Sequence, residues 1–237
     1  MNLKQNLYNL LYSFGLNVKL VKPDNNLWLT NLGIETVLDI GANDGDYARR
    51  ISQILPEARI YSFEPIPSCY QQLLEKTKSL KITTFPFALG EKEEQLSINV
   101  SAHSPSSSLL GMASLHEEMF EGSGYVKSEI ITVKRLDDIA NQLNLSKKYL
   151  VKIDVQGFED KVIKGGFETI RHASVIVIET SFQELYKGQM LFGEIHDLLQ
   201  SLGFRFGGNL SQAKFWKDGS FLYADSVFFN RSLESEK

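Results

Sequence analysis

The sequence is short of cysteine, of positive charge and of long apolar runs, and each shortage excludes a class of protein. Cys69 is the only cysteine among 237 residues, so no disulfide can form within the chain. Lysine and arginine number 25 against 29 aspartates and glutamates, a balance that argues against a nucleic-acid partner. No run of 18 apolar residues is present to cross a bilayer. We therefore expect a cytoplasmic protein with no integral membrane segment.

Short apolar runs alternate with longer amphipathic segments along most of the chain. β-branched runs that end in glycine or proline are typical of buried parallel strands, and apolar residues three or four apart predict helices. Strands are expected at residues 36–41, 59–63, 83–89, 149–155 and 175–179, followed by an antiparallel pair at 204–206 and 221–229. Helices are expected at about 43–55, 67–78, 159–170 and 192–202. This alternation predicts an α/β fold with a mainly parallel sheet.

Residues 95–143 interrupt the alternation. Two segments of period two, 96–100 and 129–133, are predicted as strands. The serine-rich loop 101–108 and a short helix at 113–120 lie between them. We interpret this stretch as a hairpin-like insertion ahead of the fourth strand of the sheet.

The first 31 residues differ from the rest. Leucines at positions 3, 7, 10 and 11 have helical spacing, but the polar face lacks the basic residues of a membrane-surface helix. We expect residues 1–31 to form a helical cap that packs over the substrate cleft, and residues 32–231 to form one α/β domain.

A loop with two glycines, Asp39–Tyr47, joins the first expected strand to its helix. Small residues let a ligand approach the backbone, and the helix start offers free N–H groups. The glycines at 41 and 45 do not form the G-x-G-x-x-G pattern of dinucleotide-binding proteins. Asp44 and Asp46 would repel a diphosphate there and would suit a cationic ligand such as S-adenosylmethionine. The alternative is that both only cap the helix.

The residues that end the strands are the next candidates, because ligands bind beyond the carboxyl ends of parallel strands. Glu64 ends the second strand, 23 residues after Gly41, where an acidic residue commonly binds a ribose diol. Lys152 and Asp154 share one face of strand 149–155, and Asp154 ends it. Asp154 is expected to take a substrate proton or to orient an ammonium group. Lys152 could instead form a structural ion pair with Asp154 or Asp39.

Five motifs in order resemble the FkbM family of S-adenosylmethionine-dependent methyltransferases. They are Val37–Tyr47, Phe63–Pro65, Ala88–Gly90, Leu136–Ile139 and Lys152–Glu159. The resemblance implies a Rossmann-like class I methyltransferase with a seven-stranded, mostly parallel sheet whose last strand is antiparallel. It also implies methyl transfer to a hydroxyl oxygen of a sugar, a polysaccharide precursor or a secondary metabolite. Many family members carry glutamate where this chain has Gln156, which weighs against a base or metal-ligand role at this position.

These arguments assign the site residues. S-adenosylmethionine is expected at Asp39, Gly41, Ala42, Asn43, Gly45, Tyr47, Glu64, Pro65 and Ala88. Catalysis is assigned to Asp154 and Lys152, and contacts to a small-molecule or carbohydrate acceptor to His103, Ser107 and Glu179. Glu179 and His103 are alternative bases.

No metal is predicted, although a divalent ion at Asp154 is an alternative for which no second ligand is evident. Two other functions stay open. One is a nicotinamide-dependent oxidoreductase, disfavoured by the missing middle glycine and the acidic helix start. The other is a non-catalytic nucleotide-binding module.

Overall fold

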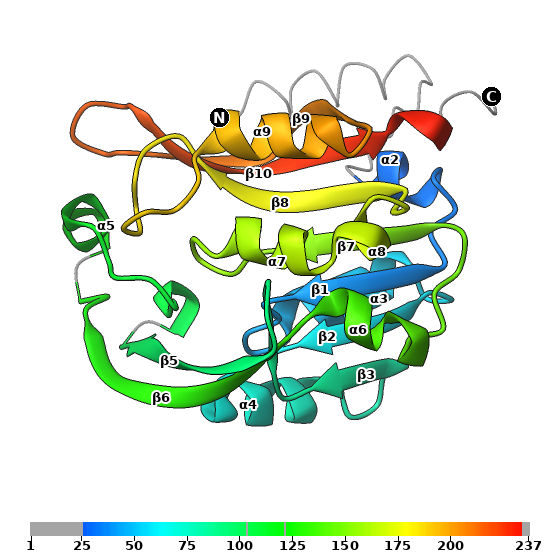
Figure 1. Ribbon diagram of the computed structural model, residues 1–237, viewed down its shortest axis with the longest axis horizontal. Coiled ribbons are helices and arrows are strands. Elements are labelled where there is room, and N and C mark those ends of the chain that lie inside the picture. Colours follow the sequence, from blue (N-terminus) through cyan, green and yellow to red (C-terminus); the bar gives the residue numbers. More distant parts are fainter. Residues whose placement is uncertain (1–25, 103, 121, 234–237) are drawn as a thin grey trace, which may run out of the picture.

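A seven-stranded sheet forms the centre of the protein (Figure 1). The computed structural model describes residues 26–102, 104–120 and 122–233. In spatial order the strands are β3 (Ile82–Phe85), β2 (Arg59–Phe63), β1 (Thr36–Ile40), β7 (Tyr149–Ile153), β8 (Val175–Ser181), β10 (Phe221–Asn230) and β9 (Phe204–Lys214). The first five run parallel, and β10 runs antiparallel to both of its neighbours. The predicted mostly parallel sheet with an antiparallel last strand is confirmed.

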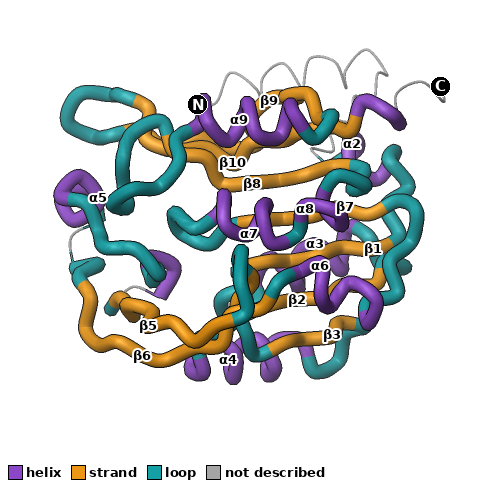
Figure 2. The backbone as a smooth tube through the Cα atoms, viewed as in Figure 1, coloured by secondary structure: helices purple, strands orange, loops and turns teal. Residues whose placement is uncertain are grey.

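Helices cover both faces of this sheet (Figure 2). One face carries α6 (Leu136–Ile139), α7 (Glu159–Gly165), α8 (Phe167–Ile170) and α9 (Phe192–Ser201). The other carries α2 (Leu27–Thr30) and α3 (Asp46–Ile54), and α4 (Pro67–Thr77) packs beside α3. In β1, Leu38 and Ile40 face the first group while Val37 faces the second. This alternation is the period of a strand buried on both sides.

The insertion is a second, three-stranded sheet. β5 (Glu94–Ser101) and β6 (Tyr125–Lys134) form the predicted antiparallel hairpin, and β4 (Ala88–Leu89) joins β6 in parallel. A helix, α5 (Ser114–Met119), lies between β5 and β6 in the chain. In Figure 1 this sheet and α5 lie at one end of the large sheet, beside the ends of its parallel strands.

Three predicted elements differ in extent. The strand expected at 83–89 is divided between β3 and β4, because Pro86 has no N–H to donate and restricts the residue before it. The helix expected at 159–170 is divided at Gly166 into α7 and α8. β9 continues to Lys214, well beyond residue 206, through pairing with β10. Its largely exposed residues carry no apolar alternation that could have predicted this extension.

The predicted N-terminal helix lies outside the described residues. Of the expected cap, the described part includes α2, which lies at the end of the sheet where β1 begins (Figure 1). There Leu29 is buried and the Trp28 ring meets Phe229 edge-on at 6.1 Å. Within the described ranges, no helix is both long enough and apolar enough to span a membrane.

Candidate active site

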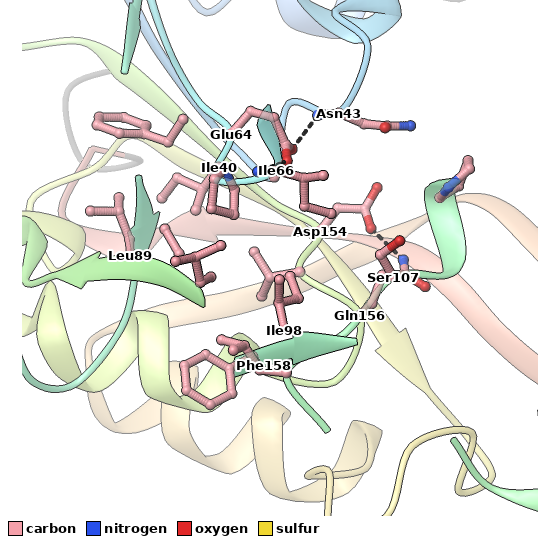
Figure 3. A pocket seen from close by; sticks show the side chains of 18 residues that line it. Ile40, Asn43, Glu64, Ile66, Leu89, Ile98, Ser107, Asp154, Gln156 and Phe158 are labelled. Carbon is pink, nitrogen blue, oxygen red and sulfur yellow. Dashed lines mark hydrogen bonds between the residues drawn. The ribbon is translucent and has the colours of Figure 1, made fainter. Parts of the chain in front are cut away.

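A pocket opens where β1, β2 and β7 end, with one wall supplied by the insertion (Figure 3). It encloses about 700 Å³ outside protein atoms, part of it open to solvent, a size typical of small-molecule sites. Seven of the predicted residues line it: Gly41, Asn43, Glu64, Pro65, Ala88, Ser107 and Asp154. Apolar side chains that the sequence had not singled out form much of the remaining wall: Ile66, Ile98, Leu109, Ile131 and Phe158.

The Glu64 carboxylate is fixed at the edge of this pocket by two backbone donors. The N–H of Asn43 donates to Oε2 and the N–H of Ile66 donates to Oε1, each at 2.8 Å (Figure 3). Burial raises the pKa of Glu64 to about 7, against the lowering effect of these two donors. Because a carboxylate has about four acceptor positions, two remain for a ligand. Glu64 therefore fits a ligand that offers hydroxyl donors.

The loop between β1 and α3 depends on left-handed backbone at Gly41 (φ 79°) and Asn43 (φ 48°). A Cβ at Gly41 would lie 1.9 Å from the carbonyl oxygen of Asp154. Gly45 also has positive φ, and it precedes the first turn of α3. The predicted cofactor residues Ala42 and Gly45 are buried and build the loop, but they do not line the pocket.

Gly41→Ala is expected to lower the free energy of unfolding by more than about 3 kcal/mol, because the added methyl group meets backbone and the required φ is strained. Urea denaturation measures the effect. Gly193→Ala is the control, since Gly193 lies in α9 with nothing within 4 Å of its Cβ position. That variant should be unchanged or more stable by up to about 1 kcal/mol. Equal stability of the two variants would contradict the packing described for Gly41.

Lys152 connects the strand ends behind the pocket and lines none of its wall. Its Nζ lies 3.5 Å from Oδ1 of Asp39 and 3.3 Å from Oδ2 of Asp154, and donates to the Gly41 carbonyl at 3.0 Å. The Tyr47 ring lies beside this ammonium, 5.2 Å from ring centre to Nζ. Burial alone would lower the pKa of Lys152, but the two carboxylates raise it above the ordinary lysine value. The ion pairs considered for Lys152 are therefore both present.

Asp39 is fully buried in this cluster. Ser62 Oγ donates to its Oδ2 at 3.3 Å, whereas Oδ1 has no hydrogen-bond partner among the described residues. Burial raises the pKa of Asp39 and Lys152 partly offsets this. Asp39 and Tyr47, both expected to bind the cofactor, lie beside Lys152 and do not line the first pocket.

The acidic start of α3 does not face the pocket. Lys76 of α4 forms salt bridges with both Asp44 and Asp46, and Arg49 adds a second cation 3.5 Å from Asp46. Neither aspartate lines the pocket. The expectation that these two carboxylates select a cationic ligand is therefore wrong, because cations of the protein itself already offset them.

A second pocket adjoins the first and shares Pro105, Asp154 and Gln156 with it. Its other lining residues are Ser106, His116, Phe120, Glu179, Leu185 and Tyr223. The predicted Glu179 is thus placed here and Ser107 in the first pocket, while His103 lies outside the described residues.

A chain of hydrogen-bonded side chains lies beside the second pocket, and the sequence did not suggest it. Tyr186 donates to Oε1 of Gln156 at 2.6 Å, and its hydroxyl lies 3.1 Å from Nε2 of His116. Gln156 Nε2 in turn donates to Asp154 at 2.7 Å and to Glu179 at 3.1 Å. Gln156 has φ 55°, a conformation uncommon for a side-chain-bearing residue and often found at functional sites.

Comparison with known proteins identifies the family. The model of the methyltransferase FkbM domain matches residues 39–206, which contain all the described residues that line the first pocket. The chain belongs to the FkbM methyltransferase family. It is 32% identical over 172 residues to the 2-O-methyltransferase NoeI of Sinorhizobium fredii, covering 70% of this chain and 71% of NoeI. It is 26% identical to the hexuronic acid methyltransferase AglP of Haloferax volcanii, covering 61% of this chain and 55% of AglP.

The solved structures agree with the fold. A crystal structure of methyltransferase FkbM from Methylobacillus flagellatus superposes with a TM-score of 0.51 at 16% identity. The match covers 88% of this chain and 48% of that one, so this FkbM protein spans about half of its solved relative. The order and directions of the strands are those of a Rossmann-like class I methyltransferase. In the part of the chain that the structure describes, no group of three or more His, Cys, Asp or Glu side chains could hold a metal ion.

Proposed function

We propose that this FkbM protein transfers a methyl group from S-adenosylmethionine to a hydroxyl oxygen of a saccharide or a similar polyhydroxylated acceptor. The observation that carries the proposal is the buried Glu64 carboxylate, which faces the pocket with two free acceptor positions beside the glycine loop. The names of two relatives support the acceptor class, since one is a 2-O-methyltransferase and the other acts on a hexuronic acid.

The residues present fit S-adenosylmethionine. Glu64 would accept hydrogen bonds from the ribose hydroxyls, each contributing about 1.5–3 kcal/mol. The apolar wall formed by Ile66, Ile98 and Phe158 would bury the adenine. Asp154 at the end of β7 would attract the ammonium group of the methionine part. When bound, this cofactor supplies a methyl group that is already activated by a sulfonium.

The protein has therefore mainly to position an acceptor oxygen and to remove its proton. Alignment of the reacting atoms lowers the barrier by converting a bimolecular step into an effectively unimolecular one. A base within hydrogen-bonding reach of that proton raises the rate by about 10²–10⁴-fold. Asp154 lines both pockets, so it would contact the cofactor on one side and the acceptor on the other. Lys152 would position the Asp154 carboxylate through their ion pair.

A nicotinamide-dependent oxidoreductase was the first alternative function, and the structure removes one of the two arguments against it. The acidic helix start no longer argues against a diphosphate, because Lys76 pairs with it. The missing middle glycine still argues against a dinucleotide, and membership of a methyltransferase family weighs more heavily. A non-catalytic role would be favoured by cofactor binding without transfer to any acceptor.

Isothermal titration calorimetry tests the cofactor. We expect S-adenosylmethionine and S-adenosylhomocysteine to bind, and NAD and NADP to give no heat. A methylation assay with labelled cofactor and a panel of glycosides then tests the transfer. Tighter binding of NAD than of S-adenosylhomocysteine would contradict the proposal.

A further inference from the structure

We infer that the second pocket is the acceptor site, that it takes a saccharide without negative charge, and that Glu179 receives the proton of the reacting hydroxyl. The inference rests on the proposed function and deepens it. It starts from the position of the pocket, which shares Asp154, Gln156 and Pro105 with the cofactor pocket. An acceptor in the second pocket would meet the first pocket at Asp154.

The lining of the second pocket suits a hydroxylated ring. Asp154 and Glu179 accept hydrogen bonds, and the Phe120 and Tyr223 rings offer apolar surface beside them. The described lining residues include no lysine and no arginine. An acceptor that carries a carboxylate would therefore meet no cation in the pocket lining, and it would lie against Glu179, which has no lysine or arginine partner among the described residues. Like charges at such distances repel strongly away from bulk water. Neutral hydroxyl donors meet no such repulsion.

The two carboxylates of this pocket differ in their partners. Asp154 is paired with Lys152, whose Nζ lies 3.3 Å from Oδ2. Glu179 has no lysine or arginine within salt-bridge distance among the described residues, and its one hydrogen-bond donor is the Gln156 amide. A carboxylate without a cation is the stronger proton acceptor, so the geometry favours Glu179 as the base.

The surroundings of Glu179 also strengthen it as a proton acceptor, because they raise its pKa. Burial raises its pKa well above the ordinary glutamate value, and the neighbouring carboxylates raise it further. Asp154 and Glu159 face it from β7 and the start of α7, Asp225 is its register partner on β10, and Lys152 provides a smaller opposing effect. The phenols of Tyr186 and Tyr223 also lie near it, since Glu179 raises the pKa of each. Such a carboxylate is a stronger proton acceptor than an ordinary glutamate.

Gln156 holds the base in place. The Tyr186 hydroxyl donates to Oε1, which fixes the direction of the amide, so that Nε2 points to Asp154 and Glu179. The two carboxylates are thereby kept close together by a neutral donor. Gln156 is a positioning residue in this arrangement.

The reaction balances without a further reactant. The O–H bond of the acceptor breaks and its proton moves to a Glu179 oxygen, while the electron pair of the acceptor oxygen forms the new C–O bond to the methyl carbon. The electron pair of the broken C–S bond stays on sulfur, which becomes a neutral thioether. Release of the proton to solvent restores the Glu179 carboxylate.

The first experiment compares acceptors and variants. Wild-type protein with labelled S-adenosylmethionine is offered 4-nitrophenyl glycosides of neutral hexoses and deoxyhexoses and the matching glucuronide at pH 8. We expect label in at least one neutral glycoside and none in the glucuronide. Glu179→Gln should lower turnover by about 100-fold or more with unchanged affinity for S-adenosylhomocysteine. Glu75→Gln, which removes an exposed carboxylate of α4 that lines neither pocket, should retain turnover at pH 8.

The second experiment measures the base directly in protein without cofactor. Carbon-13 NMR of protein labelled at the glutamate side-chain carboxyl carbon should contain one signal that is missing from Glu179→Gln. Its titration midpoint should lie well above the ordinary glutamate value of about 4.3. Asp225→Asn should lower that midpoint, because it removes a facing negative charge, whereas an ordinary midpoint would contradict the environment described for Glu179.

Each failure has a distinct meaning. No binding of S-adenosylhomocysteine would overturn the proposed function itself. Binding without transfer to any neutral glycoside, or faster transfer to the glucuronide, would overturn the acceptor assignment. An ordinary NMR midpoint, or turnover that survives in Glu179→Gln but is lost in Asp154→Asn, would overturn Glu179 as the base.

Discussion

Replacing Glu64 with alanine is expected to weaken the binding of S-adenosylhomocysteine by about 2–4 kcal/mol, roughly 30- to 1,000-fold in dissociation constant. The variant loses the proposed ribose acceptors and also the two backbone hydrogen bonds that hold Asn43 and Ile66. Calorimetry on folded variant measures the loss. Glu75→Ala, which removes an exposed carboxylate from the neighbouring α4, is the control and should bind as wild type. An unchanged dissociation constant in Glu64→Ala would exclude Glu64 as the ribose contact.

The same carboxylate predicts a pH dependence of binding. Because the pKa of Glu64 is raised to about 7, protonation removes its charge as the pH falls below 7. Affinity should then fall by up to tenfold per pH unit. The stability of the free protein changes with pH in the opposite direction. Because the pKa of Glu64 is raised on folding, the folded state becomes more stable as the pH falls from about 7 toward 4.5. The thermal shift caused by the ligand should therefore shrink with acid, and Glu64→Gln should flatten this profile.

Replacing Lys152 with methionine is expected to lower the stability of the protein strongly. The change leaves Asp39 fully buried without its cation, and breaking a buried ion pair on one side costs about 3–5 kcal/mol. For a chain of this size we expect a fall in Tm of roughly 6–20 °C. Differential scanning calorimetry measures it. Lys78→Met, which removes an exposed partner of Glu75, should change the free energy of unfolding by no more than about 0.5 kcal/mol.

A double variant separates the ion pair from the packing of the lysine stem. Asp39→Asn combined with Lys152→Met removes both charges at once, so it should recover a substantial part of the stability that Lys152→Met loses. If the stability losses of the two single variants simply add in the double variant, loss of the ion pair does not explain the destabilisation by Lys152→Met. Recovered stability with weakened binding of S-adenosylhomocysteine would support Lys152 as a positioning residue for the loop, through its bond to Gly41.

The fold and many residues of the first pocket were predictable because their signals are local. The buried strands show as apolar runs, and the turn after β1 shows as Gly41 and Gly45 with the small residues between them. Glu64 was predictable because the spacing from the glycine loop to the end of the second strand is set by one βαβ unit. Each of these signals lies within a few tens of residues, which is the range over which local pattern determines structure.

The second pocket was not predictable in this way. Tyr186 and His116 are 70 residues apart, and Tyr186 and Gln156 are 30 apart, yet their polar atoms meet within 3.1 Å and 2.6 Å. The pairing of Lys76 with Asp44 and Asp46 likewise depends on how α4 packs beside α3. Periodicity describes which face of an element is buried, but it does not say which distant side chain lies opposite. Packing of the insertion against the strand ends brings His116, Gln156 and Glu179 around one pocket, and their electrostatic environment follows from that packing.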